Sequence, residues 1–213
     1  MIEVNSGRAS RTKKRTRIQA RNQTRILDAA LEIFSVHGFR GATVDRIAEA
    51  AGMSKPNLLY YFGRKKEIYL AVLRRTLEMW LAPFEEIRAE GDPEAEIRRY
   101  ITRKLEFSRT HPAESRLFLN EIIQGAPMLG EVLRTRLREL VDEKAAIFEK
   151  WAAEGRIASL DPYHLVFMLW AMTQHYADFE AQIEAVLPGD REALFGKAGE
   201  VVPAILLRGL LPR

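Results

Sequence analysis

The strongest constraint on the fold is a pair of short helices joined by one glycine, encoded as TVDRIAEAAGMSKPNLLYYFGRKK at residues 43–66. Thr43 and Ser54 are residue types that accept hydrogen bonds at helix N-termini, and Pro56 stands in a first turn, where its missing N–H costs nothing. Gly52 supplies the turn between the two helices. The pattern therefore predicts a helix-turn-helix in this segment.

Each of the two helices has one apolar side. In the first helix the apolar residues recur at helical spacing, at Val44, Ile47, Ala48 and Ala51. In the second helix the residues expected to face inward are Leu58, Leu59 and Phe62. The side chains of the second helix that remain available to a partner are Lys55, Asn57, Tyr60 and Tyr61.

The charge is divided unevenly along the chain. Residues 1–66 contain 14 Lys and Arg against 5 Asp and Glu, whereas the rest of the chain contains 19 against 24. The formal net charge of +4 therefore conceals a strongly basic first third. A basic segment that includes a helix-turn-helix indicates binding to a polyanion.

Residues 1–21 carry much of this positive charge with almost no apolar partners. Their cations include Arg8, Arg11, Lys13, Lys14, Arg15 and Arg17. Since a segment of this composition buries too little surface to fold alone, we expect a flexible basic arm. A solubilising tail is one interpretation, but beside a helix-turn-helix the contact of this arm with phosphates or with the minor groove is favoured.

Length and composition are those of an ordinary globular protein. The 213 residues suit one or two domains with a sizeable core. The absence of cysteine excludes disulfides and thiolate metal sites and fits a reducing compartment. The chain has no apolar run of about 18 residues and no secretion-type apolar stretch near its start, so we expect a cytoplasmic protein with no membrane partner.

Beyond the arm, apolar residues recur with helical period almost throughout, and the pattern predicts no strand. Gly38 ends the first helix, the pairs Asp92-Pro93, His111-Pro112 and Asp161-Pro162 begin later ones, and residues 125–127 (Gly-Ala-Pro) break another. The sequence thus predicts an all-α fold of nine helices. Their approximate positions are 26–38, 44–51, 55–62, 65–89, 93–110, 112–124, a helix reaching 154, 161–187 and 191–211.

Along residues 29–73 the chain resembles the DNA-binding head of TetR-family transcriptional regulators, in the sequence AALEIFSVHGFRGATVDRIAEAAGMSKPNLLYYFGRKKEIYLAVL. The resemblance implies a three-helix DNA-binding domain at residues 22–66. It also implies a six-helix domain for ligand binding and dimerisation at residues 67–213. Many members carry an aromatic residue at the position of Leu59, so the contacts of such an aromatic are not carried over.

The second short helix should enter the major groove, where base edges are distinguishable. The side chains placed to read bases are Lys55, Pro56 and Asn57. The side chains expected at phosphates, which fix register without reading sequence, are Thr43, Ser54, Tyr60, Tyr61 and Lys65. Either tyrosine would alternatively belong to the core, which is the commoner fate of an aromatic ring.

The resemblance also implies a homodimer on a palindromic operator, because two heads related by two-fold symmetry meet successive major grooves. The expected dimer surface combines the helix at 161–187 with the last helix, which together carry more apolar surface than one core needs. Its residues are His164, Phe167, Met168, Ala171, Leu206, Leu207 and Leu210.

A polar spot interrupts the apolar helix expected at 161–187. Trp170, Thr173, Gln174 and Ala177 are spaced so that they share one face. A buried polar group needs a partner, for which a neighbouring helix is the commoner choice and a bound ligand is another. Gln174 offers a hydrogen-bond acceptor beside a donor, which complements the imide edge of a pyrimidine.

The resemblance favours a bound ligand, rather than a neighbouring helix, as the partner of this polar spot. Similarity to a family member that binds uracil or thymine runs through the segments NLLYYF, LEMWLAPFEEI, ESRLF, LWAMTQHYADFEAQIEAV and RGLLPR. It implies a pocket formed by Trp80, Trp170 and Gln174, with Phe118 and Asn120 as further candidates. It implies neither a cofactor nor a metal. The helix expected at 65–89 would couple pocket and head, because it carries both Lys65 and Trp80.

The sequence leaves two alternative functions open. A TetR-type regulator of an unrelated hydrophobic ligand is one alternative, and an effector-independent architectural DNA binder is another, although the latter leaves six further helices unexplained. Enzyme motifs are lacking, with no GxSxG, HExxH, P-loop or GxGxxG after a strand. His175 and Asp178 form a pair too common in helices to indicate a metal site.

Overall fold

The computed structural model describes the backbone of residues 6–212 and the side chains of residues 17–212. All regular structure in this range is helical, so the predicted all-α class is confirmed there. The elements are α1 (Ser6–Gly41), α2 (Val44–Ala50), α3 (Lys55–Tyr61), α4 (Lys65–Glu85), α5 (Pro93–Thr110), α6 (Pro112–Ile123), α7 (Gly130–Val132), the π-helical segment η1 (Leu133–Leu137), α8 (Arg138–Ala153), α9 (Pro162–Asp178), α10 (Glu180–Val186) and α11 (Arg191–Leu210).

Two of the nine predicted helices are divided into shorter elements, which the sequence did not reveal. The helix expected at 161–187 is divided between α9 and α10 at Phe179, which has φ −117° and ψ 32° and stacks on His175 at 4.8 Å. The helix that reaches Glu154 consists of α7, η1 and α8 in succession. Both divisions depend on local backbone geometry that apolar periodicity alone does not encode.

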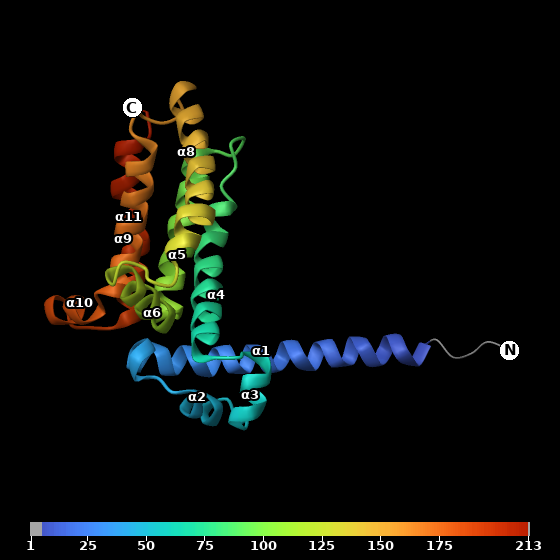
Figure 1. The fold of residues 1–213 in the computed structure, drawn as a ribbon. Coiled ribbons are helices and arrows are strands. Elements are labelled where there is room, and N and C mark those ends of the chain that lie inside the picture. The colour runs from blue at the N-terminus through green and yellow to red at the C-terminus, as the bar shows by residue number, and fades with distance from the viewer. Residues whose placement is uncertain (1–5, 213) are drawn as a thin grey trace. The chain divides into compact units, whose positions relative to one another are not determined.

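The chain divides into two compact units, and the division falls within α4, after Arg74. Unit 1 contains α1, α2 and α3 and the start of α4, and unit 2 contains the remaining helices (Figure 1).

In unit 1, α2 packs against both α1 and α3. Gly38 has φ 63° and ψ 179°, so it breaks α1 at the residue where the sequence predicts a helix end. Aromatic rings fill the core nearby: the ring of Tyr69 lies 4.9 Å from that of Phe34 and 5.0 Å from that of Phe39. These contacts hold the first turns of α4 to the end of α1.

The basic segment differs from the expected arm of residues 1–21. It is helical from Ser6 onward and continuous with the helix predicted at 26–38, while residues 1–5 lie outside the described range. The composition accounts for the helix, because Arg, Lys, Gln and Ala are good helix formers and no proline interrupts the segment.

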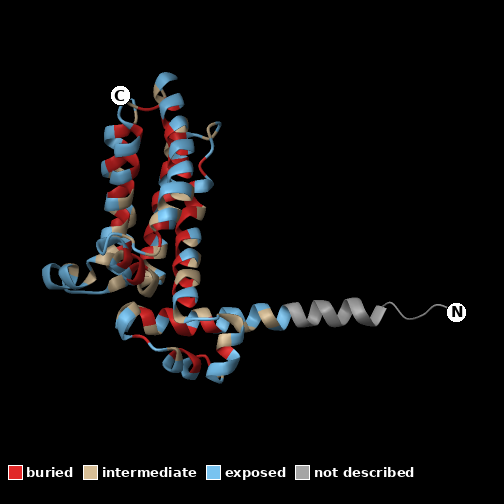
Figure 2. Ribbon diagram, viewed as in Figure 1, coloured by how far each residue is buried: buried red, intermediate tan, exposed pale blue. Residues whose placement is uncertain are grey.

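In unit 2, α5, α8, α9 and α11 run lengthwise beside one another, and α6 and α10 lie across one end (Figure 1). Buried residues line the surfaces between these helices, and exposed residues face outward (Figure 2). Three helices begin at a capping aspartate whose carboxylate accepts a backbone N–H, as the Asp-Pro pairs predict in two cases. These aspartates are Asp92, Asp161 and Asp190.

The end of α4 and the loop after it are held by side chains of α8. Lys144 is buried, and its Nζ donates to the carbonyls of Glu85 (3.0 Å) and Ile87 (3.1 Å). The indole N–H of Trp151 donates to the Ala89 carbonyl at 2.8 Å. Carbonyls at a helix end need such partners, so these bonds fix where α4 stops. None of the described helices combines the length and apolar character that crossing a membrane requires.

Candidate nucleic-acid interface and ligand cavity

The helix-turn-helix is built as the sequence predicts. The Arg46 N–H donates to Thr43 Oγ1 (3.2 Å) at the start of α2, and the Asn57 N–H donates to Ser54 Oγ (3.4 Å) at the start of α3. Gly52 has φ +61°, a conformation that favours glycine, and an added Cβ would lie only 3.0 Å from the Arg25 guanidinium. The turn thus requires Gly52 for its backbone conformation, and a larger residue would also displace the Arg25 guanidinium.

The side chains expected to read bases share the outer side of α3. Lys55, Pro56 and Asn57 are exposed, whereas Leu58 is fully buried beneath them. Lys55 Nζ lies 3.0 Å from Asp45 Oδ2, in an ion pair whose two side chains are 49% and 67% exposed. A pair this exposed contributes little to stability, so a nucleic-acid acceptor can replace Asp45.

The two tyrosines of α3 have different surroundings. Tyr60 is 69% exposed. Tyr61 is half-buried, and its hydroxyl accepts a hydrogen bond from Asn22 Nδ2 at 2.8 Å. Tyr60 is therefore free to meet a phosphate, while Tyr61 links α3 to α1.

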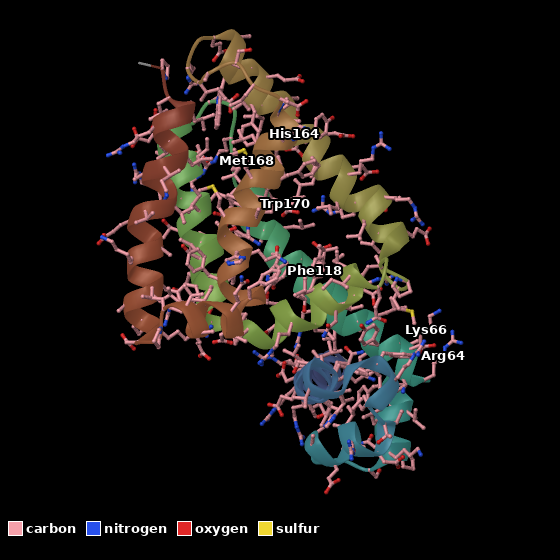
Figure 3. The ribbon with its side chains drawn as sticks, turned by 90° about the vertical axis from the view of Figure 1, so that its left-hand side faces the viewer. Arg64, Lys66, Phe118, His164, Met168 and Trp170 are labelled. Atoms are coloured by element: carbon pink, nitrogen blue, oxygen red, sulfur yellow. The ribbon has the colours of Figure 1, made fainter. Side chains whose placement is uncertain are left out.

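Lys65 lies inside unit 1 rather than at an open surface. Its ammonium donates to the carbonyls of Phe39 and Ala42, both at 2.8 Å, and it lies 4.6 Å from the centroid of the Phe39 ring. The expected phosphate contact thus competes with three internal ones. Its neighbours Arg64 and Lys66 are exposed at the start of α4 (Figure 3), although the phosphate contacts predicted from the run Arg-Lys-Lys included only Lys65.

A small cavity in unit 2 brings together four of the five predicted ligand-binding residues. Its volume is about 60 Å³. It is lined by Leu77, Trp80, Leu81, Lys104, Phe118, Leu137, Trp170 and Gln174. The rings of Trp80 and Phe118 meet edge to face with centroids 4.8 Å apart, and Figure 3 shows Phe118 and Trp170 among the helices of this unit.

Asn120 does not line this cavity and is exposed. It lies two positions after Phe118 on α6, about 200° around the helix, so the turn that directs Phe118 inward directs Asn120 outward. The sequence interpretation of Asn120 as a cavity residue is therefore corrected.

Lys104 is the charged cavity residue that was not predicted from the sequence. It is 4% exposed, and burial lowers its pKa to about 8, while the charge of Asp178 acts in the opposite direction. A signal for it exists in the sequence, because Ile97, Tyr100, Ile101, Lys104 and Leu105 follow the spacing of one buried helical face. A lysine inside such a stripe must find a partner or a functional use.

Hydrogen bonds fix the polar end of the cavity. Asp178 accepts from the Ser115 hydroxyl and from the Gln174 side chain, while burial raises the pKa of the Asp178 carboxyl. The Trp170 side chain hydrogen bonds Tyr100, whose pKa is raised by burial. Trp170, Gln174 and Asp178 are spaced four residues apart, so α9 presents all three on one side.

The surface expected to form a dimer is only partly as predicted. His164, Phe167 and Met168 of α9 are exposed, and Figure 3 shows His164 and Met168 along this helix. The three leucines expected from α11 are instead buried within the unit. These are Leu206, Leu207 and Leu210. The large apolar residues that α11 exposes are Val201 and Ile205.

Unit 2 also has larger hollows, of which two are grooves that lie against α11. One of about 320 Å³ runs between α9 and α11 beside Met168 and Ile205. The other, of about 460 Å³, lies between α10 and α11. Neither has a buried charged group like Lys104 in its lining, so the smaller cavity has the better chemistry for a polar ligand. Among the side chains described, no group of three or more His, Asp or Glu is arranged to hold a metal ion.

Two family profiles together match nearly all of the chain beyond the basic segment. The one described as "Bacterial regulatory proteins, tetR family" matches residues 26–72, and "YcdC-like protein, C-terminal region" matches residues 73–213. The HTH-type transcriptional regulator RutR of Escherichia coli (strain K12) is 46% identical over 212 residues, which cover 99% of this chain and 100% of that relative. The HTH-type transcriptional repressor SCO4008 of Streptomyces coelicolor is 31% identical over 174 residues, covering 80% of this chain and 85% of the relative.

Solved structures share the fold. The ketosteroid transcriptional regulator KstR2 of Mycobacterium tuberculosis matches with a TM-score of 0.68 at 19% identity, covering 99% of this chain and 98% of that chain. AibR, solved in complex with isovaleryl coenzyme A and operator DNA, matches with a TM-score of 0.65 at 20% identity, covering 85% of this chain and 98% of that chain. The chain is a DNA-binding transcriptional regulator rather than an enzyme, and it belongs to the TetR family.

Proposed function

We propose that this regulator is a repressor that binds a palindromic operator as a homodimer and leaves it when uracil or thymine enters the cavity of unit 2. Its place of action is the cytoplasm, where operator DNA lies. The observation that carries the proposal is the cavity itself, in which aromatic rings surround two polar groups, Lys104 and Gln174. Flat apolar walls with a few convergent polar groups suit a planar, polar heterocycle.

On the DNA side, α3 reads the major groove through Lys55, Pro56 and Asn57. Phosphate contacts come from Thr43, Ser54, Tyr60 and the exposed cations Arg64 and Lys66. We assign Tyr61 and Lys65 to positioning, because both are hydrogen-bonded within unit 1. Two such heads meet major grooves about 34–36 Å apart, or a multiple of that distance.

The dimer surface is the exposed apolar side of α9 with that of α11. Phe167 and Met168 are each about half exposed, and Ile205 is 61% exposed. Apolar side chains gathered in this way favour association with a second copy. The groove between α9 and α11 belongs to the same surface.

Coupling between the two activities runs along α4. This helix contributes Leu77, Trp80 and Leu81 to the cavity and carries Lys65 at its first residue. Lys65 and Trp80 are separated by about 22 Å along the helix axis. Since ligand pockets usually measure about 300–1,000 Å³, a cavity of about 60 Å³ must widen to hold a ring. The ligand then favours the conformation that leaves DNA.

The test begins with isothermal titration of the purified protein with uracil, thymine and a hydrophobic control compound. Wild-type binding of a pyrimidine, lost in Gln174→Ala but kept in the exposed control Asn120→Ala, supports the assignment. Binding of the hydrophobic compound alone, unaffected by Gln174→Ala, supports a regulator of unrelated ligands instead.

The second arm measures operator binding. An operator is selected from genomic fragments, and its fluorescence anisotropy is followed as the ligand is added. Release by uracil or thymine in wild type, but not in Gln174→Ala, agrees with the proposal. Equal affinity of the liganded and free protein for the operator contradicts it, and indifference to every small molecule tested indicates an architectural DNA binder.

A further inference from the structure

Lys104 brings a buried positive charge to the wall of the effector cavity. It extends from α5, and its Nζ lies 4.6 Å from the centroid of the Trp80 ring. In the structure this Nζ donates no hydrogen bond to any described residue, and its electrostatic partner is Asp178. An ammonium group has three N–H donors, which need acceptors when water is excluded.

Gln174 supplies the opposite polarity beside Lys104. Its side chain hydrogen bonds Asp178, and an ionised carboxylate only accepts, so the Gln174 amide nitrogen is the donor. This bond fixes the amide orientation. The carbonyl oxygen of Gln174 is then the atom left to accept a hydrogen bond from a molecule in the cavity.

We propose that Lys104 determines the specificity of the cavity by donating to a ring carbonyl, while Gln174 Oε1 accepts from the adjacent ring N–H. The pair thereby selects planar heterocycles that carry a lactam or imide edge. This inference rests on the proposed function, in which the cavity holds the effector. It extends that proposal by naming the donor and the order of polar groups that the ligand must present.

The same arrangement excludes rings with the reversed order. An amino group beside an unprotonated ring nitrogen places N–H groups against the Lys104 ammonium and a lone pair against Gln174 Oε1. Both contacts are repulsive, and such repulsion is an effective source of specificity. For a lactam, the ammonium exchanges its contact with the Trp80 ring for a charge-assisted hydrogen bond, which is the stronger interaction.

The experiment titrates the full-length protein with uracil and with two rings of nearly the same shape, pyrimidin-2-one and 2-aminopyrimidine. The first of these two presents a lactam edge, and the second presents the reversed edge. We expect wild type to bind uracil and pyrimidin-2-one at least 30-fold more tightly than 2-aminopyrimidine. Lys104→Met should reduce this preference to less than 3-fold, because Met keeps an unbranched stem and removes the donor.

Lys104→Gln and Lys150→Met serve as matched variants. Glutamine retains a neutral donor, so Lys104→Gln should keep part of the preference for uracil and pyrimidin-2-one over 2-aminopyrimidine. This variant also tests the proposal where Lys104→Met fails to fold. Lys150 is exposed on α8, and its variant should behave as wild type.

The outcomes separate the two proposals. Equal uracil binding by wild type and Lys104→Met overturns the role of Lys104 and leaves the pyrimidine assignment intact. A wild type that ignores uracil and thymine but prefers pyrimidin-2-one through Lys104 supports the role of Lys104 and overturns the pyrimidine assignment. Failure of wild type to bind any of the rings overturns both.

Discussion

The ammonium of Lys65 both hydrogen bonds the carbonyl of Phe39, at 2.8 Å, and lies 4.6 Å from the centroid of the same residue's ring. A third contact, to the Ala42 carbonyl, completes its surroundings. Lys65, the first residue of α4, is thus hydrogen-bonded within unit 1, while its neighbours Arg64 and Lys66 remain at the surface.

The first prediction compares the adjacent lysines. Lys65→Met should lower the free energy of unfolding of the protein by about 1–3 kcal/mol, because two part-buried carbonyls lose their donor. Lys66→Met should leave unfolding unchanged and weaken binding to any duplex, with a salt-dependence slope reduced by about 1. Urea denaturation and anisotropy titrations at several salt concentrations measure the two effects. The reverse pattern would show that Lys65 is the phosphate contact.

The second prediction concerns sequence reading by Lys55. Lys55→Met should weaken binding to the operator by about 1–3 kcal/mol and weaken binding to a scrambled duplex much less, because a base contact is lost. The exposed ion pair with Asp45 contributes little to stability, so the urea unfolding curve of Lys55→Met should match that of wild type. Lys66→Met is the control, since it should weaken both duplexes alike. Equal losses in Lys55→Met would assign Lys55 to a phosphate.

The third prediction concerns the end of α4. Lys144→Met leaves the carbonyls of Glu85 and Ile87 without their donor, so we expect a loss of about 1–3 kcal/mol in stability. Lys150→Met on the same helix removes an exposed lysine and should cost less than about 0.5 kcal/mol. Thermal melts at one fixed protein concentration compare the two. Matching melting temperatures would contradict a role for Lys144 in holding this end of α4.

The helices could be predicted from their caps, because a cap is a local signal. Thr43, Ser54, Asp92 and Asp161 each accept the backbone N–H that their position implies. Gly38 likewise breaks α1 where predicted. Such bonds join residues only three positions apart, so the sequence itself contains the whole interaction.

Side chains whose roles depend on distant contacts could not be assigned in this way. Lys104 and Lys144 are buried lysines, and only the packing of other helices reveals which acceptors or rings surround them. Asn120 was misplaced because the register of α6 against the cavity is a tertiary property. Periodicity narrows the choice to one face of a helix, but it does not say what that face meets.

The fourth prediction follows from the charge of Lys104. Burial lowers the pKa of Lys104 to about 8, and the charge of Asp178, a carboxyl that also faces His175, raises it in part. If the charged form donates to the ligand, uracil affinity should be constant below this pKa. It should then fall by up to tenfold per pH unit as the pH rises above about 8, because binding must then include uptake of a proton.

Calorimetry checks two directions: whether a proton is taken up on binding, and whether loss of the Asp178 charge shifts the decline in affinity to lower pH. At pH 8, titrations in buffers with different ionisation enthalpies should show proton uptake on uracil binding in wild type and none in Lys104→Met. Asp178→Asn removes the charge that raises the Lys104 pKa, so its decline in affinity should begin at lower pH than in wild type. A decline that persists unchanged in Lys104→Met would assign the titration to another group, and proton release by wild type would reverse the assigned role of the ammonium.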